Sequence, residues 1–129
     1  MAKSLPRPTD AELAILRVLW ERGPATVRQV HDVLAGDRET GYTTTLKLMQ
    51  IMAEKGLVTR DESARTHVYA AGVSRDRTQR QLVNDLIDRA FGGSAAALVL
   101  QALSAQPASE QELSEIRRLI DDYRKTRTR

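Results

Sequence analysis

Apolar residues recur every three or four positions along two segments near the start of the chain. This spacing places them on one side of an α-helix, so each segment is predicted to be an amphipathic helix with one buried face. The apolar positions are Leu13, Leu16, Leu19 and Trp20 within residues 9–22, and Val27, Val30, Val33 and Leu34 within residues 26–35.

Both segments begin with the same polar signal, a capping box. The hydroxyl of a threonine accepts a backbone N–H three residues later, and the Glu or Gln at that position accepts the threonine N–H in return. Gly23-Pro24 is predicted to end the first helix and Gly36 the second, because these residues do not continue a helix well. The two boxes are Thr9 with Glu12 and Thr26 with Gln29.

The next segment, "GYTTTLKLMQ" at residues 41–50, is ambiguous by itself. Its threonines and leucines have a good β propensity. The continuation "IMAEKG" is instead rich in helix formers, and a lysine followed by glycine is a common helix C-terminus. We therefore predict a helix over residues 43–55, with Thr43 as its N-cap.

This third helix has two different faces when its residues are placed about 100° apart. One face is mainly apolar and is expected to look inward, whereas the other offers hydroxyl, amide and ammonium groups to the outside. The inward residues are Thr45, Leu48, Met49 and Met52, the outward ones are Thr43, Lys47 and Gln50, and the flanks are Thr44, Leu46 and Ile51.

Two short β-rich runs follow, "LVTRD" and "THVYAA", joined by "ESAR". They predict a β-hairpin over residues 57–71. Three helices followed by a hairpin is the element order of a winged helix-turn-helix. We therefore expect a mainly α protein whose residues 1–73 form a winged-helix DNA-binding domain.

Residues 74–129 are predicted to form three further helices and a dimerisation domain. The helices cover 75–91, 94–105 and 110–125; a capping box of Ser109 and Glu112 begins the last, and "TRTR" at its end is expected to fray. Residues 94–105 are apolar nearly all round, which predicts burial. The apolar faces need a partner, either a second copy, which we favour, or residues 1–72 of the same chain. The predicted dimer contacts are Leu82, Leu86, Ala90, Leu98, Leu100, Leu113, Ile116, Ile120 and Tyr123.

Composition narrows the class of protein. The chain has 129 residues, of which 41% are hydrophobic and 29% charged, and this is typical of a folded protein. It has no cysteine, which excludes disulfides and thiolate metal sites. No apolar run reaches the roughly 18 residues of a membrane helix, and the start of the chain lacks the apolar core of a signal peptide. We expect a cytoplasmic protein that does not bind membranes.

The sequence contains few residues in a pattern that would support catalysis. The two histidines, His31 and His67, lie on different predicted elements, and neither has a metal-ligand companion at helical spacing. Ser63 and Ser74 have no nearby base, and no glycine-rich phosphate loop is present. We therefore expect a protein without enzymatic activity, metal or cofactor.

DNA binding explains more of the pattern, although the net charge of +3 is too small to decide it. In a helix-turn-helix the second helix enters the major groove, where threonine, lysine and glutamine can contact base edges and phosphates. The hairpin tip would touch phosphates or the minor groove. The alternatives are that the threonines only cap a core helix, or that the module binds a protein. The predicted DNA contacts are Thr43, Thr44, Leu46, Lys47, Gln50, Lys55, Arg65 and His67.

The chain resembles the penicillinase repressor family, which includes BlaI, MecI and the copper-responsive CopY branch. The resemblance covers nearly the whole chain and rests on "TDAELAILRVLWERGPATVRQVHDVL", "GYTTTLKLMQIMAEKGLV", "RTHVYAA" and the helical second half. It implies a homodimeric repressor on an inverted-repeat operator. It also implies a membrane sensor peptidase as a partner, which triggers cleavage of the repressor.

Four features depart from the family pattern. Lys47 stands where a threonine is frequent and Ile51 where an arginine is frequent, so the base preference is expected to differ. Gln101-Ala102 replaces the Asn-Phe pair of cleavable relatives, which puts inactivation by that cleavage in doubt. The cysteine cluster of the copper branch is absent, so induction through metal thiolates is excluded.

Overall fold

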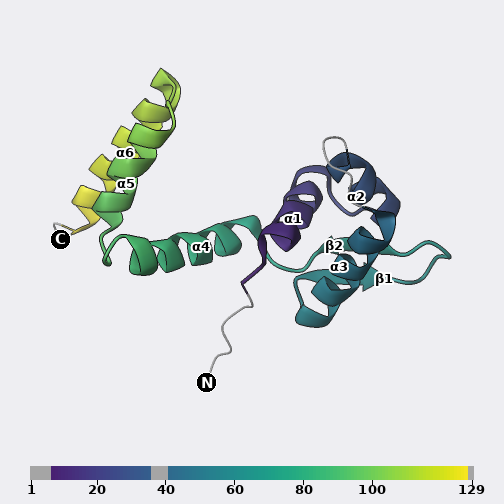
Figure 1. Cartoon of the computed structure of the whole chain (residues 1–129). Coiled ribbons are helices and arrows are strands. Elements are labelled where there is room, and N and C mark those ends of the chain that lie inside the picture. Colours follow the sequence, from purple (N-terminus) through teal and green to yellow (C-terminus); the bar gives the residue numbers. More distant parts are fainter. Residues whose placement is uncertain (1–6, 36–40, 128–129) are drawn as a thin grey trace. The chain divides into compact units, whose positions relative to one another are not determined.

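The computed structural model describes residues 7–35 and 41–127. Figure 1 shows helices and a single hairpin in the order expected for a winged helix-turn-helix followed by a helical region. The predicted fold class is therefore confirmed. The elements are α1 (Asp10–Arg22), α2 (Val27–Leu34), α3 (Tyr42–Lys55), β1 (Val58–Asp61), β2 (Val68–Ala71), α4 (Arg75–Ala90), α5 (Ala95–Ala105) and α6 (Glu110–Arg127).

The predicted capping boxes are present and fix where helices begin. Thr9 and Thr26 cap α1 and α2, and in both boxes the backbone and side-chain hydrogen bonds are formed. Ser109 and Glu112 exchange the same two bonds before α6. Gly23 ends α1 with a φ of 91°, a left-handed value that favours glycine.

The start of α3 differs from the prediction. The helix begins at Tyr42, with Gly41 as its N-cap, and Thr43 is an exposed residue inside the first turn. The N–H groups of Thr44 and Thr45 donate to the Gly41 carbonyl at 3.1 and 3.2 Å, so they take part in the first turn of the helix. The prediction failed because glycine caps a helix without a side-chain signal.

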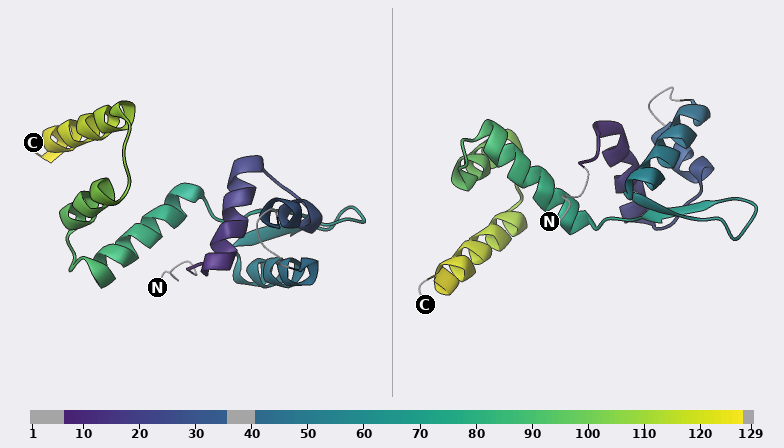
Figure 2. Two further views of the ribbon diagram at one scale, coloured as in Figure 1. Left: turned by 45° about the horizontal axis from the view of Figure 1, so that its top comes forward. Right: turned by 90° about the horizontal axis from the view of Figure 1, so that it is seen from below.

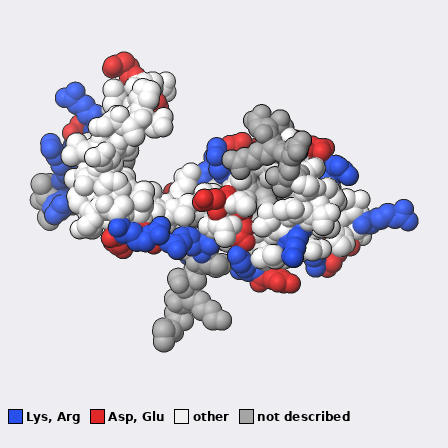
Figure 3. All heavy atoms as spheres, in the orientation of Figure 1, with Lys and Arg blue, Asp and Glu red and all other residues white. Residues whose placement is uncertain are grey.

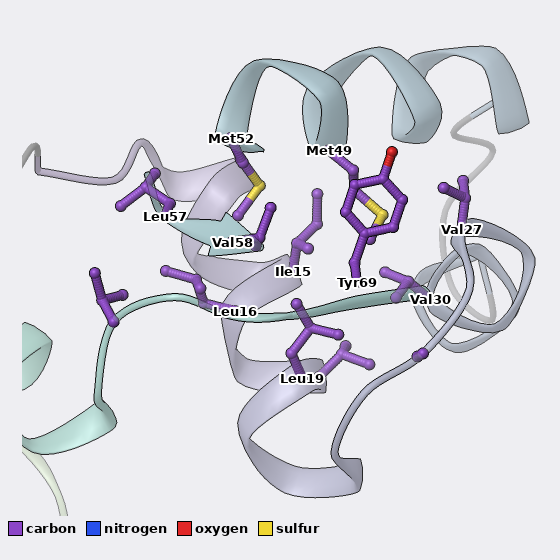
Figure 4. Close-up of a cluster of buried hydrophobic side chains, with 13 residues drawn as sticks. Ile15, Leu16, Leu19, Val27, Val30, Met49, Met52, Leu57, Val58 and Tyr69 are labelled. Atoms are coloured by element: carbon purple, nitrogen blue, oxygen red, sulfur yellow. The ribbon is translucent and has the colours of Figure 1, made fainter. Parts of the chain in front are cut away.

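One apolar core joins α1, α2, α3 and the hairpin. Figure 4 shows Met49 and Met52 of α3 pointing into the core, with Ile15 of α1 between them and the Tyr69 ring of β2 next to Met49. This arrangement fixes which face of α3 is hidden. The buried apolar residues are Ile15, Leu16, Val18, Leu19, Ala25, Val27, Val30, Met49, Met52, Leu57, Val58, Tyr69 and Val73.

The hairpin is an antiparallel pair in which Val58 faces Ala71 and Asp61 faces Val68. Ala25, just before α2, adds a third short segment by exchanging two backbone hydrogen bonds with Tyr69 at 2.9 and 2.8 Å. The loop of the hairpin projects from the winged-helix unit in both views of Figure 2. The two strands are shorter than the predicted runs, so His67 lies just before β2 rather than within it.

The chain divides into two compact units, Met1–Asn84 and Asp85–Arg129. The dividing point lies inside α4, because the start of that helix packs on the winged-helix unit: Trp20 Nε1 donates to the Val73 carbonyl at 3.0 Å, and the Arg75 guanidinium lies 5.9 Å from the Trp20 ring. Trp20 is thus at the edge of the core, partly exposed, and not inside it. The predicted functional domains, 1–73 and 74–129, stay a prediction.

The last two helices differ from the prediction in two respects. No residue of α5 or α6 is buried in the single chain, whereas the sequence predicted burial of residues 94–105. Helix α6 continues to Arg127, so part of the expected frayed end is helical. The predicted end of α2 at Gly36 lies outside the described residues, but Ala35 already caps the helix.

Among the described residues, no single helix is long and apolar enough to cross a membrane. The bent pair of α4 and α5 reaches the required length and hydropathy only when both helices are counted together.

Candidate nucleic-acid interface

The outward face of α3 is polar and exposed, as predicted. Thr43, Thr44, Lys47 and Gln50 are all exposed to solvent. On the opposite side Thr45, Met49 and Met52 are buried in the core. The buried residues fix the rotation of the helix, so its polar side chains must face away from the protein.

Leu46 has an intermediate position. It is partly buried and packs against the core, but it also lines a groove of about 330 Å³ beside α3. The groove lies between the start of α2, the exposed side of α3 and the hairpin. Its lining residues are Thr26, Val27, Arg28, Tyr42, Leu46, Gln50, Arg60, Arg65, Thr66, His67 and Tyr69.

Three arginines from three different segments line this groove: Arg28 from α2, Arg60 from β1 and Arg65 from the hairpin loop. In Figure 3 the tip of the hairpin, which projects on the right, consists of basic side chains. The acidic side chains visible in this view lie away from that tip. A groove with several arginines and few carboxylates suits a polyanion such as a phosphate backbone.

The Arg60 guanidinium is held in place by the hairpin itself. It hydrogen-bonds the Tyr69 phenol and lies 3.4 Å from Glu62, and these contacts, Tyr69 first, raise the pKa of Arg60 above its ordinary value. His67 Nε2 lies 4.0 Å from the same Glu62 carboxylate. Glu62 therefore tempers the positive charge at this side of the groove.

A second cluster lies where α2 meets the start of α3. The Arg28 guanidinium sits 4.5 Å from the centre of the Tyr42 ring, and the His31 ring meets Tyr42 edge-on at 5.8 Å and 87°. His31 Nδ1 is 3.3 Å from the buried Thr45 hydroxyl. Tyr42, the first residue of α3, is thus held by two residues of α2.

Lys55 lies at the other end of α3 from Thr43 and Thr44. Its ammonium pairs at 2.8 Å with Glu12 Oε2 of α1, while Glu12 Oε1 accepts the Thr9 N–H at 2.9 Å. Burial alone would raise the pKa of Glu12, but the hydrogen bonds from Lys55 and Thr9 outweigh it and lower that pKa. This contact ties α3 to α1, and DNA binding by Lys55 stays a prediction.

Sequence reasoning missed Arg28, Tyr42 and Arg60. Arg28 and Arg60 stand among ordinary charged residues, and Tyr42 was taken only as the residue before a helix. Their proximity depends on how α2, α3 and the hairpin pack, which no local pattern reveals. A possible signal was the place of Arg28 at the second helical position of α2, outside the apolar positions of that helix.

This fold and surface define a winged helix-turn-helix protein. The outward face of α3, the second helix of the motif, is polar, and a basic groove lies beside the hairpin. The chain belongs to the penicillinase repressor family, whose sequence model matches residues 8–122. The expectation drawn from the residue motifs is therefore confirmed. The family is one of transcriptional repressors and not a class of enzymes.

Individual relatives agree with this assignment. The transcriptional regulator BlaI of Mycobacterium tuberculosis is 41% identical over 102 residues, which cover 77% of this chain and 73% of the relative. The penicillinase repressor of Bacillus licheniformis is 20% identical over 95% of both chains. The methicillin resistance regulatory protein MecI of Staphylococcus aureus is 18% identical over 88% of this chain and 92% of the relative.

Two solved structures share the winged-helix fold. The DNA-binding domain of the repressor BlaI in solution is 22% identical, with a TM-score of 0.50, over 57% of this chain and 90% of that one. The monomeric form of Bacillus licheniformis BlaI in complex with the blaP half-operator has a TM-score of 0.50 at 21% identity, over 58% of this chain and 92% of that one.

Proposed function

We propose that this protein is a transcriptional repressor that binds operator DNA sequence-specifically as a homodimer on an inverted repeat. The observation that carries the proposal is the exposed polar face of α3 beside a groove lined by three arginines. In a helix-turn-helix such a face reads base edges in the major groove, while basic residues around it contact phosphates. The relative solved with a half-operator supports DNA as the ligand.

The exposed residues of α3 and of the hairpin tip each have a chemical role in this proposal. Thr43 and Thr44 offer a methyl and a hydroxyl to thymine methyls and to acceptor atoms. Lys47 reaches a guanine edge or a phosphate, and Gln50 suits adenine. Arg65 at the hairpin tip contacts phosphates or the minor groove.

Dimer formation is proposed from the apolar surface of α4, α5 and α6. Few contacts link these three helices within residues 75–127, and large apolar side chains stay exposed in the single chain, with Leu100 at 68% and Leu119 at 69%. Such an apolar surface is rare on a monomer and marks an interaction site. A second copy of the chain would cover it and place two recognition helices about one DNA turn apart.

The repressor would act in the cytoplasm by occupying the operator and blocking transcription. A membrane sensor peptidase as its partner is proposed from the family resemblance alone. Gln101 and Ala102 lie exposed in α5 of the single chain, where a protease would meet a helix without the Asn-Phe pair of cleavable relatives.

Lys47→Ala and Arg65→Glu test the DNA surface. A base contact by Lys47 predicts a loss of discrimination of roughly 1–3 kcal/mol, whereas a phosphate contact predicts weaker binding to all sequences and a smaller salt slope. The measurement is titration of labelled duplexes at several salt concentrations, with unfolding curves as a check of folding. Folded variants with full affinity and an unchanged salt slope would exclude these residues from the interface.

Leu100→Asp tests the dimer. The charge should disrupt an apolar contact, shift sedimentation toward the monomer and weaken operator binding sharply, because each monomer then binds its half-site alone. Gln101→Asp places the same charge at a neighbouring polar position of α5 and should leave the dimer intact. A dimer that survives Leu100→Asp unchanged contradicts the assignment of α5 to the interface.

The rival function is a winged-helix module that binds a protein. A gel shift with mixed-sequence DNA separates the two, because DNA binding loses affinity steeply between about 50 and 200 mM salt. Absence of any shift at low salt would favour the protein-binding module.

A further inference from the structure

Arg28 is exposed on α2, and its guanidinium lies over the Tyr42 ring, 4.5 Å from the ring centre. No ion pair joins it to a carboxylate among residues 7–35 and 41–127. Tyr42 is itself 37% exposed, so the stack lies at the surface and not in the core. As far as the described residues go, the Arg28 guanidinium therefore retains hydrogen-bond donors for a ligand.

The stack has a defined place in the helix-turn-helix. Arg28 lies in the first turn of α2, which contains no acidic residue, and the helix dipole makes this end favourable to an anion. The first helix of a helix-turn-helix crosses the DNA backbone when the second enters the major groove. Arg28 also lines the same groove as Gln50 and Arg65.

From this geometry we infer that Arg28 and Tyr42 form a phosphate clamp, in which Tyr42 positions the Arg28 guanidinium for one backbone phosphate. This inference deepens the proposed function and rests on it. The aromatic face restricts the arginine before DNA arrives, so less side-chain freedom is lost on binding. Its planar fork can still give two parallel hydrogen bonds to phosphate oxygens while one face stacks on the ring.

The clamp also links the phosphate to the reading helix. Tyr42 is the first residue of α3, and the His31 ring packs against it in a T-shaped arrangement, with the ring centres 5.8 Å apart. His31 in turn lies 3.3 Å from the hydroxyl of Thr45, which is buried on the inward side of α3. A phosphate bound by Arg28 would therefore set the position of the first turn of α3, where Thr43 and Thr44 face the bases.

The test uses the full chain and a labelled mixed-sequence duplex of about 30 base pairs, or three turns. Arg28→Gln should raise the dissociation constant by roughly tenfold and reduce the salt slope by about 0.9 per bound protomer. Arg17→Gln removes the same charge from α1, outside the groove, and serves as the matched control. Unfolding curves verify that each variant is folded.

The role of Tyr42 is tested by a double-mutant cycle. Tyr42→Leu should weaken binding in the natural background but have little effect once Arg28 is Gln, whereas Tyr42→Phe, which keeps the ring, should retain most of the affinity. If Tyr42→Leu does not fold, the Arg28→Gln salt slope decides alone.

Two results would overturn the clamp: a salt slope that Arg28→Gln leaves unchanged, or fully additive effects of the two substitutions. A different result of the same assay would contradict the proposed function: no salt-dependent binding of the natural chain to the duplex.

Discussion

Replacing Lys55 by Met should destabilise the winged-helix unit, because it removes the partner of a buried carboxylate. Glu12 is only 2% exposed, and Lys55 Nζ and the Thr9 N–H hold its two oxygens at 2.8 and 2.9 Å. Without Lys55 the carboxylate stays buried with one donor fewer. The natural pair connects α1 with α3 across 43 positions of sequence.

The size of the effect lies between two limits. Removing one partner of a fully buried ion pair costs about 3–5 kcal/mol, whereas an exposed pair contributes about 0.2–1 kcal/mol. The Lys55 side chain is 38% exposed and its partner 2%, so we expect an intermediate loss of about 2 kcal/mol. With an m-value of about 2 kcal/mol per molar, the urea midpoint should fall by about 1 M.

The assay is urea unfolding of the full chain at fixed protein concentration, followed by circular dichroism at neutral pH. Lys55→Arg keeps a charged donor and should lose less stability, while Lys47→Met removes an exposed lysine from the same helix and should change stability little. An unchanged free energy of unfolding in Lys55→Met would refute the reasoning. If Lys55→Met kept its stability but bound DNA more weakly, Lys55 would belong to the DNA interface, as the sequence suggested.

The same pair predicts a dependence on pH. Folding lowers the pKa of Glu12, so its stabilisation is complete above the ordinary value of 4.5 and is lost as the pH falls through the lower folded-state pKa. In Lys55→Met the Glu12 carboxylate loses the hydrogen bond from Lys55 but stays buried. The folded-state pKa of Glu12 should therefore be higher in the variant than in the natural chain. The difference in stability between the natural chain and the variant should therefore shrink in acid, and a constant difference would contradict this account.

Three further substitutions test the fold around the site. Gly72→Ala should destabilise by roughly 1–3 kcal/mol in urea unfolding, because a Cβ there would lie 2.8 Å from the Gly56 carbonyl oxygen; full stability would show that the backbone yields easily. Trp20→Phe should cost about 1 kcal/mol by circular dichroism through the lost hydrogen bond to the Val73 carbonyl, and no loss would mean that water replaces it. Thr26→Ala should cost about 1 kcal/mol through the lost cap of α2, whereas Thr26→Ser should be nearly neutral; equal losses in both would point to packing of the threonine methyl.

The sequence predicted what depends on near neighbours. Capping boxes such as Thr26 with Gln29 act over three residues, and apolar periodicity marks the buried face of each helix, so the element order and the faces of α3 followed from the sequence. The cap at Gly41 was missed because the residue has no side chain to signal it. Because the cap lies two residues before Thr43, the N–H groups of Thr44 and Thr45 donate to the Gly41 carbonyl.

Contacts between distant segments were not predictable in the same way. Arg28 over Tyr42 depends on how α2 packs against α3, and Lys55 with Glu12 joins the end of α3 to the start of α1. The apolar composition of α5 predicted burial, but a single chain does not bury it. That surface is the physical reason for proposing a second copy.

The most direct test of the central claim is selection of bound sequences from a random DNA library with the chain of 129 residues. A dimer with two recognition helices predicts an enriched palindromic consensus, with half-sites about one turn apart. Lys47→Ala should relax or change the preference within each half-site. A lack of enrichment, or a single site without symmetry, would contradict sequence-specific binding by a homodimer.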